Sequence, residues 1–137
     1  MTTELPEDLE SHQEVNYRNK VILFAGIEPS QSVSKVWIIH FSGEVEKGKN
    51  LRYGRNGHSV HMEPGEQFCY ILGGQDAQKK LQSRCEAYDL NDLKSKTFAK
   101  LKKGRLNCGT MKINGQFYVF GGTDLEGNLI DNVECLS

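Results

Sequence analysis

The sequence predicts an all-β protein that repeats one antiparallel sheet in tandem, and three observations support this prediction. An apolar run ends on a pair of small residues three times, at Ala25-Gly26, Gly73-Gly74 and Gly121-Gly122, and successive pairs lie 48 residues apart. A fixed period of this size indicates one supersecondary unit copied along the chain. The runs are apolar at consecutive positions, which is typical of strands covered on both faces. No segment shows sustained 3.6-residue periodicity, so we expect no long helix.

Each of the first two repeats is expected to contribute four strands, and the third repeat three. Their β-branched and aromatic residues favour strands, and Asn114-Gly115 is a strong signal for a two-residue hairpin. The expected strands are 11–15, 21–25, 35–41 and 49–53 in the first repeat, 58–62, 68–73, 84–90 and 97–101 in the second, and 108–113, 117–121 and 132–136 in the third. Residues 1–10 are predicted to form a polar, acidic arm with a short helical turn after Pro6.

Four antiparallel strands per repeat, burial on both faces and a period near 50 describe the blades of a β-propeller. The predicted blades cover residues 11–53, 58–102 and 108–137, and the last one is incomplete. Propellers typically need at least four blades to close, so this chain alone is not expected to close a ring. It would therefore be part of a longer propeller, join other copies or partners, or form an open wedge.

These residues resemble the kelch motif, in which an apolar strand ends in Gly-Gly and Arg-x-x-His precedes the strand. The resemblance covers nearly the whole chain, and the second repeat matches best. Ala25, Cys108 and Leu136 depart from the pattern, and the single tryptophan lies on a third strand rather than a fourth. The resemblance implies a propeller that binds partners through its loops. The motif positions are Gly26, Gly73, Gly74, Gly121, Gly122, Arg55, His58, Arg105, Trp37 and Tyr88.

Composition narrows the function classes. The net charge of −1 gives no global field for nucleic acid, and no apolar stretch is long enough to span a membrane. The acidic N-terminus resembles neither a secretory signal nor a transit peptide. Cysteines 69, 85, 108 and 135 form no C-x-x-C, so we expect buried reduced thiols, with a disulfide or a zinc site as alternatives. We therefore expect an intracellular, cytoplasmic protein.

The sequence offers no catalytic, cofactor or metal site. His58 and His61 are three residues apart, and in a strand this spacing places them on opposite faces, which is poor geometry for one ion. There is no nucleophile elbow and no phosphate-binding loop. We therefore predict a non-enzymatic protein. The alternative is a fragment of a kelch-type oxidase or sugar isomerase whose catalytic residues lie outside this chain.

The polar loops are the candidate binding elements, because segments 27–34, 75–83 and 123–131 differ from one another as loops without a packing role do. Residues 79–105 carry nine basic residues against three acidic ones, which could meet an acidic partner; the alternative is an edge strand guarded by lysines. We predict a protein-interaction module or scaffold that binds a protein partner, with further blades from another chain or a second copy possible. The candidate partner-binding residues are Gln75, Asp76, Lys79, Lys80, Asp124, Glu126, Arg55 and Lys103.

Overall fold

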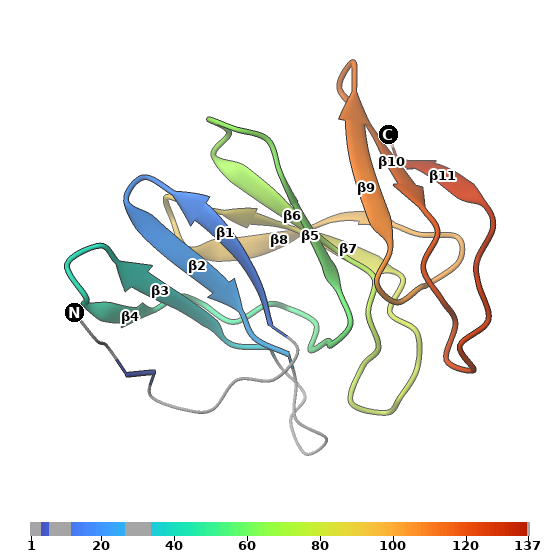
Figure 1. Cartoon of the computed structure of the whole chain (residues 1–137), viewed down its shortest axis with the longest axis horizontal. Coiled ribbons are helices and arrows are strands. Elements are labelled where there is room, and N and C mark those ends of the chain that lie inside the picture. Colours follow the sequence, from blue (N-terminus) through green and yellow to red (C-terminus); the bar gives the residue numbers. More distant parts are fainter. Residues whose placement is uncertain (1–3, 6–11, 27–33, 137) are drawn as a thin grey trace.

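The computed structural model describes residues 4–5, 12–26 and 34–136, and these form eleven strands in three antiparallel sheets (Figure 1). The order along the chain is retained in space, with each sheet a meander of consecutive strands. The described residues contain no helix, and therefore none that could cross a membrane. The predicted arm, apart from residues 4–5, and most of loop 27–34 lie outside the described residues.

Sheets of four, four and three strands confirm the predicted all-β class and the three copies. Sheet 1 contains β1 (Gln13–Tyr17), β2 (Lys20–Phe24), β3 (Val36–His40) and β4 (Val45–Lys47). Sheet 2 contains β5 (Ser59–Met62), β6 (Phe68–Leu72), β7 (Arg84–Asp89) and β8 (Lys94–Lys100). Sheet 3 contains β9 (Gly109–Ile113), β10 (Gln116–Phe120) and β11 (Val133–Leu136).

The fourth strand of sheet 1 does not lie at residues 49–53, where the sequence predicted it. A tight turn with Gly43 at φ 94° reverses the chain at once, so that β4 pairs with β3. Residues 49–53 instead belong to the connection toward sheet 2. Leu51 is 1% exposed there, and its N–H donates to the carbonyl of Ser34 at 2.9 Å. Its apolar side chain packs in the core between sheets 1 and 2, although the residue does not belong to a strand.

The sheets stack face to face, and sheet 2 is covered on both sides. The forward face of a sheet is defined as the one toward the next sheet along the chain, and the backward face as the opposite one. Ile71 of β6 is in the core against sheet 1, whereas Leu72 is in the core against sheet 3. Both side chains are 0% exposed. Full burial of one such side chain stabilises the fold by roughly 1.5–3 kcal/mol.

Two local features explain why the repeat keeps its register. The Asn114-Gly115 hairpin joins β9 and β10 with both residues at positive φ, as predicted, since this turn matches the twist of the strands. The glycine pairs lie where two backbones approach closely. A Cβ atom at Gly74 would lie 2.7 Å from the carbonyl oxygen of Asn56, and one at Gly122 would overlap the carbonyl oxygen of Leu106. Only glycine fits both the contact and the positive φ.

Candidate partner-binding surface

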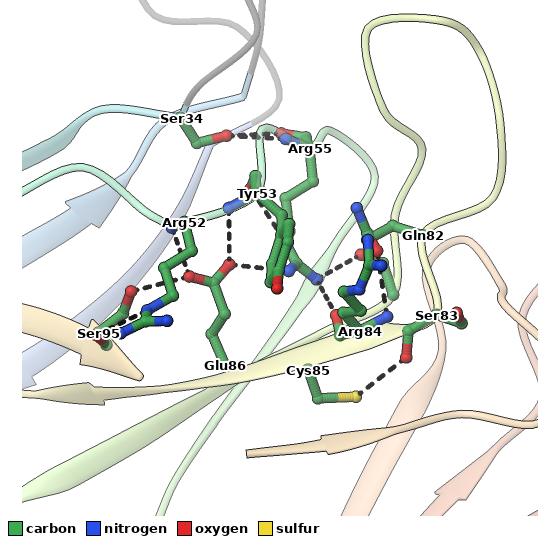
Figure 2. Close-up of polar contacts among 11 residues, drawn as sticks. Ser34, Arg52, Tyr53, Arg55, Gln82, Ser83, Arg84, Cys85, Glu86 and Ser95 are labelled. Atoms are coloured by element: carbon green, nitrogen blue, oxygen red, sulfur yellow. Dashed lines mark hydrogen bonds and ion pairs between the residues drawn. The ribbon is translucent and has the colours of Figure 1, made fainter. Parts of the chain in front are cut away.

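A buried ion pair anchors the connection between sheets 1 and 2 (Figure 2). The guanidinium of Arg55 is fully buried and donates to the carbonyl oxygens of Gly73 and Arg84, both at 2.9 Å. It also pairs with the carboxylate of Glu86 at 2.8 Å, and both side chains are 0% exposed. Burial lowers the pKa of Arg55, and the charge of Glu86 opposes this shift. The guanidinium therefore belongs to the interior of the molecule.

Glu86 also holds the connection itself. Its carboxylate accepts the backbone N–H of Arg52 at 2.6 Å and that of Tyr53 at 3.4 Å. The hydroxyl of Ser95 on the neighbouring strand donates at 2.8 Å to Oε1, the oxygen that also accepts the N–H of Arg52. A buried carboxylate stays charged at low cost only when its lone pairs are satisfied, and this one is. Residues 52–55 are thus fixed over sheet 2.

The same arrangement recurs between sheets 2 and 3. Arg105 donates to the carbonyl oxygen of Gly121 at 3.2 Å and pairs with Glu134 at 2.6 Å. Glu134 accepts the backbone N–H of Lys102 at 2.6 Å and that of Lys103 at 3.1 Å. Burial raises the pKa of Glu134, but these hydrogen bonds and Arg105 outweigh it and lower the pKa overall. Both connections therefore hold their basic residues at defined places.

Loop 75–83 lies between the two connections and has a framework of its own. The carboxylate of Asp76 accepts the backbone N–H groups of Gln78 and Lys80, each at 2.9 Å. The N–H of Gln75 donates to the carbonyl oxygen of Asn56 at 2.8 Å. The bonds to Asp76 fix the loop from within, the bond to Asn56 attaches it to the first connection, and the side chains of Lys79 and Lys80 are exposed.

A groove of about 190 Å³ separates this loop from the connection before it. It is lined by Arg52, Tyr53, Gly54, Asp76, Ala77, Gln78, Gln82 and Arg84. The guanidinium of Arg84 lies over the ring of Tyr53, 5.0 Å from its centroid, which restrains both side chains. Arg52 and Arg84 are exposed at the rim.

The second connection approaches the other side of the loop, since a Cβ atom at Gly104 would lie 2.9 Å from Cβ of Leu81. Lys102 and Lys103 of this connection are exposed. Together these residues form what we call the basic loop surface: Arg52, Lys79, Lys80, Arg84, Lys102 and Lys103. The neighbouring carboxylates of Glu86 and Glu134 are paired with arginines below it, so Asp76 is the one carboxylate among the described residues that line the groove, against these six cationic side chains.

The structure separates the predicted partner-binding residues into groups. Loop 75–83 carries Gln75, Asp76, Lys79 and Lys80, and Lys103 flanks it. Asp124 and Glu126 lie in the corresponding loop of sheet 3, where the carboxylate of Asp124 accepts the N–H of Glu126 at 3.0 Å. Figure 1 shows both loops at the same edge of the molecule.

Arg55 requires a correction, because a fully buried guanidinium paired with Glu86 offers nothing to a partner. Sequence reasoning also missed Arg52, Tyr53 and Arg84. One signal was available: Arg52-Tyr53-Gly54-Arg55 parallels Lys102-Lys103-Gly104-Arg105, with a basic residue and the glycine in matching places.

Other motif positions support the fold. The hydroxyl of Tyr88 lies 2.8 Å from the carbonyl oxygen of Leu93 in the core between sheets 1 and 2. Trp37 of β3 pairs with Leu23, just as Glu86 pairs with Ile71, so the tryptophan occupies the position of the anchoring glutamate. His58 is 1% exposed, and neither ring nitrogen has a hydrogen-bond partner. Burial and the charge of Arg55 lower its pKa to about 4.

Metal-binding geometry is not found in the described part of the chain, where no three His, Cys, Asp or Glu side chains converge. His61 lies 2.9 Å from the hydroxyl of Thr110 and 2.8 Å from the carboxylate of Glu63. All four cysteines are unpaired, and three are buried. Cys135 is exposed, contrary to expectation, because no other sheet of the described residues packs on the forward face of sheet 3.

A comparison with models of protein families found no match, and a comparison with curated proteins found none either. The fold itself defines an all-β repeat protein of three antiparallel sheets, each built on the same plan. The function must therefore be inferred from the groove and the charged edge beside it.

Proposed function

We propose that the chain is a non-enzymatic, intracellular protein-interaction module whose sheets are kelch-type propeller blades, and that it binds an acidic segment of a partner protein. One observation carries this proposal: two exposed arginines line the groove and four exposed lysines lie on the loop and connection beside it, while Glu86 and Glu134 are paired with buried arginines. A surface with an excess of positive charge attracts an acidic segment and orients its approach.

The shape of the site suits a side chain or a short stretch of chain better than a broad, flat protein surface. The groove holds about 190 Å³, and Arg84 stacks on Tyr53 at its wall. Groups that are restrained before binding lose less entropy on binding. Exposed arginines at the rim can meet carboxylates through two parallel hydrogen bonds. Glutamate and aspartate side chains therefore fit the groove and its rim.

The location inside the cell rests on the thiols. Cys69, Cys85 and Cys108 are buried and unpaired, which is typical of a protein that folds in a reducing compartment. The two shared features of the connections, a buried arginine and a carboxylate that binds the backbone before it, support blades built on one plan.

The test measures binding of fluorescently labelled peptides by anisotropy. A glutamate-rich peptide should bind the wild-type chain, a glutamine-rich peptide of equal length should bind far more weakly, and added salt should weaken the acidic complex. The double variant Lys79→Glu/Lys80→Glu should lose at least tenfold in affinity.

The matched control is Lys94→Glu/Lys96→Glu, which makes the same charge change on β8 of the same sheet. Lys94 lies at the turn that joins β7 to β8, away from loop 75–83. The control should keep most of the affinity. Equal losses in the two double variants would show that only net charge matters and would reject this surface as the site.

A further inference from the structure

Exposed apolar side chains collect at the sheet 3 end of the stack, and one lies at the sheet 1 end. Among the described residues, eight large apolar side chains are exposed, and six of them lie at sheet faces that no other described sheet covers or at the loop position equivalent to Leu81, which contacts the next connection. The forward face of sheet 3 and its neighbouring loop carry Met111, Ile113, Phe120, Leu129 and Val133, and the backward face of sheet 1 carries Phe41. Isolated exposed apolar residues are ordinary, but a cluster on one face marks an interaction site.

The repeat shows what should cover sheet 3. Phe120 and Val133 occupy the positions that Leu72 and Cys85 hold in sheet 2, 48 residues earlier. Leu72 and Cys85 are 0% exposed because sheet 3 packs on them, whereas Phe120 is 39% and Val133 63% exposed. The forward face of sheet 3 thus presents the same positions as a face that elsewhere carries a further sheet.

The backbone beside the forward face of sheet 3 also indicates that a following sheet is missing there. A Cβ atom at Gly73 of sheet 2 would meet the carbonyl oxygen of Arg105, in the connection to the next sheet. A Cβ atom at the equivalent Gly121 would meet nothing within 4 Å. Likewise, Leu81 lies against Gly104, whereas its equivalent Leu129 is 84% exposed. Sheet 3 therefore leaves open the place that a following sheet and its connection fill in sheet 2.

The backward face of sheet 1 is the matching half. Phe41 takes the position of Leu90: the N–H of Phe41 donates to Asn19 at 2.9 Å, and that of Leu90 donates to the equivalent Gln67 at 2.8 Å. Leu90 is 0% exposed beneath sheet 1, whereas Phe41 is 85% exposed. Beside Phe41 is a hollow of about 470 Å³, whose lining includes Val21 and Ile39.

The first junction indicates what could enter that hollow. Tyr17, the last residue before the hairpin of sheet 1, reaches the next sheet and donates its hydroxyl to Asn91 at 2.9 Å. The residue in the same place before the hairpin of sheet 3 is Ile113, which is 48% exposed. Ile113 would thus reach the backward face of a following sheet from the position from which Tyr17 reaches sheet 2.

A difference between sheet 1 and the other two sheets favours a neighbour from a separate chain. At both internal junctions, a glutamate on the third strand accepts the backbone N–H groups of the connection from the preceding sheet. In sheet 1 this position is Trp37, whose indole has a donor and no acceptor. The junction before sheet 1 therefore lacks the group that holds a covalent connection in the other two.

We propose that two copies of the chain associate head to tail, with the forward face of sheet 3 in each copy packed against the backward face of sheet 1 in the other. The assembly rests on the proposal that the sheets are propeller blades, and not on the binding of any partner. Two copies supply six sheets, within the four to eight typical of propellers, whereas one copy supplies too few and three supply too many. Because the contact is heterologous, closure requires two identical junctions.

Light scattering during size-exclusion chromatography tests the assembly. The wild-type chain should have twice the 15.5 kDa mass of a single copy at micromolar concentration. Val133→Glu and Phe41→Glu each place a carboxylate in both junctions, so each variant should be a monomer. Leu125→Glu changes an exposed loop leucine outside the two faces and should remain a dimer.

A mixture of the two monomeric variants separates head-to-tail from face-to-face contact. Phe41→Glu retains an intact sheet 3 face and Val133→Glu an intact sheet 1 face, so the mixture should form a dimer with one junction. Circular dichroism of each variant checks that the sheets remain folded, as expected for changes at exposed sites. A monomeric wild-type chain, or a Phe41→Glu variant that stays dimeric alone, would overturn the proposal. Peptide binding by the Val133→Glu monomer reports on the basic loop surface independently.

Discussion

Replacing Glu86 with alanine removes the group on which the first connection depends. The guanidinium of Arg55, 0% exposed, would keep its charge without a counterion, and the N–H groups of Arg52 and Tyr53 would lose their acceptor. Removing one partner of a buried ion pair costs about 3–5 kcal/mol, because the other charge remains buried and uncompensated. The lost backbone hydrogen bonds act in the same direction.

This cost is large relative to the stability of a domain, which is typically about 5–15 kcal/mol. Urea denaturation followed by circular dichroism measures it. With a slope of roughly 2 kcal/mol per M, a loss of about 4 kcal/mol lowers the urea midpoint by about 2 M. Glu126→Ala removes a carboxylate from an exposed loop position and should leave the midpoint almost unchanged.

The double variant Arg55→Met/Glu86→Leu sharpens the test. Replacing a buried ion pair with apolar residues of similar volume is often neutral or stabilising, so the double variant should be more stable than Glu86→Ala. If Glu86→Ala lowered the midpoint no more than Glu126→Ala does, the ion pair would not anchor the connection, and the loop framework would have another origin.

The remaining predictions concern a glycine, a histidine and the cysteines. Gly122→Ala should destabilise the chain by about 1–3 kcal/mol, and by more than Gly127→Ala does. Both glycines have positive φ, but only Gly122 lies against a backbone oxygen. Urea midpoints compare the two variants, and equal losses would reject the steric explanation. The pKa of His58 is near 6.5 in the unfolded chain and about 4 in the folded chain. Between pH 6.5 and pH 4 the unfolded chain therefore binds a proton that the folded chain does not, and the free energy of unfolding should fall by about 3 kcal/mol as the pH drops over this range. His58→Gln should show a flatter pH dependence, and an unchanged slope would contradict the assignment. In the Val133→Glu monomer, a thiol reagent should label Cys135 quickly and the three buried cysteines only on unfolding. Burial blocks access to these thiols, and it raises the pKa of Cys85 to about 11. Mass spectrometry identifies the labelled residue, and early labelling of Cys85 would refute its burial.

The sequence was a good guide to the repeated strands and a poor one to the groove. The apolar runs and glycine pairs mark β2, β6 and β10, because a strand buried on both faces leaves a continuous signal. By contrast, β4 (Val45–Lys47) has two polar residues on an outer strand, and the apolar Leu51 nearby drew the prediction away from it.

The groove depends on pairing that spacing does not reveal. Arg52 and Arg84 are 32 positions apart and line the same groove because the connection at 52–55 is held over β7 by Glu86. The basic stretch 79–105 is not one surface, since Lys94 begins β8 at the turn from β7, far along the strand from the loop. Arg55 was expected among the exposed residues, and only its partner Glu86, on another element, explains its burial.

Trp37 gives the molecule a built-in optical probe. It is the only tryptophan of the chain, and it lies on the backward face of sheet 1, where the second copy is proposed to pack. Indole emission shifts to shorter wavelengths when water is removed from around the ring. Dilution of unlabelled protein should therefore shift the emission to longer wavelengths as the junction opens, and the midpoint of that shift would give the dissociation constant directly.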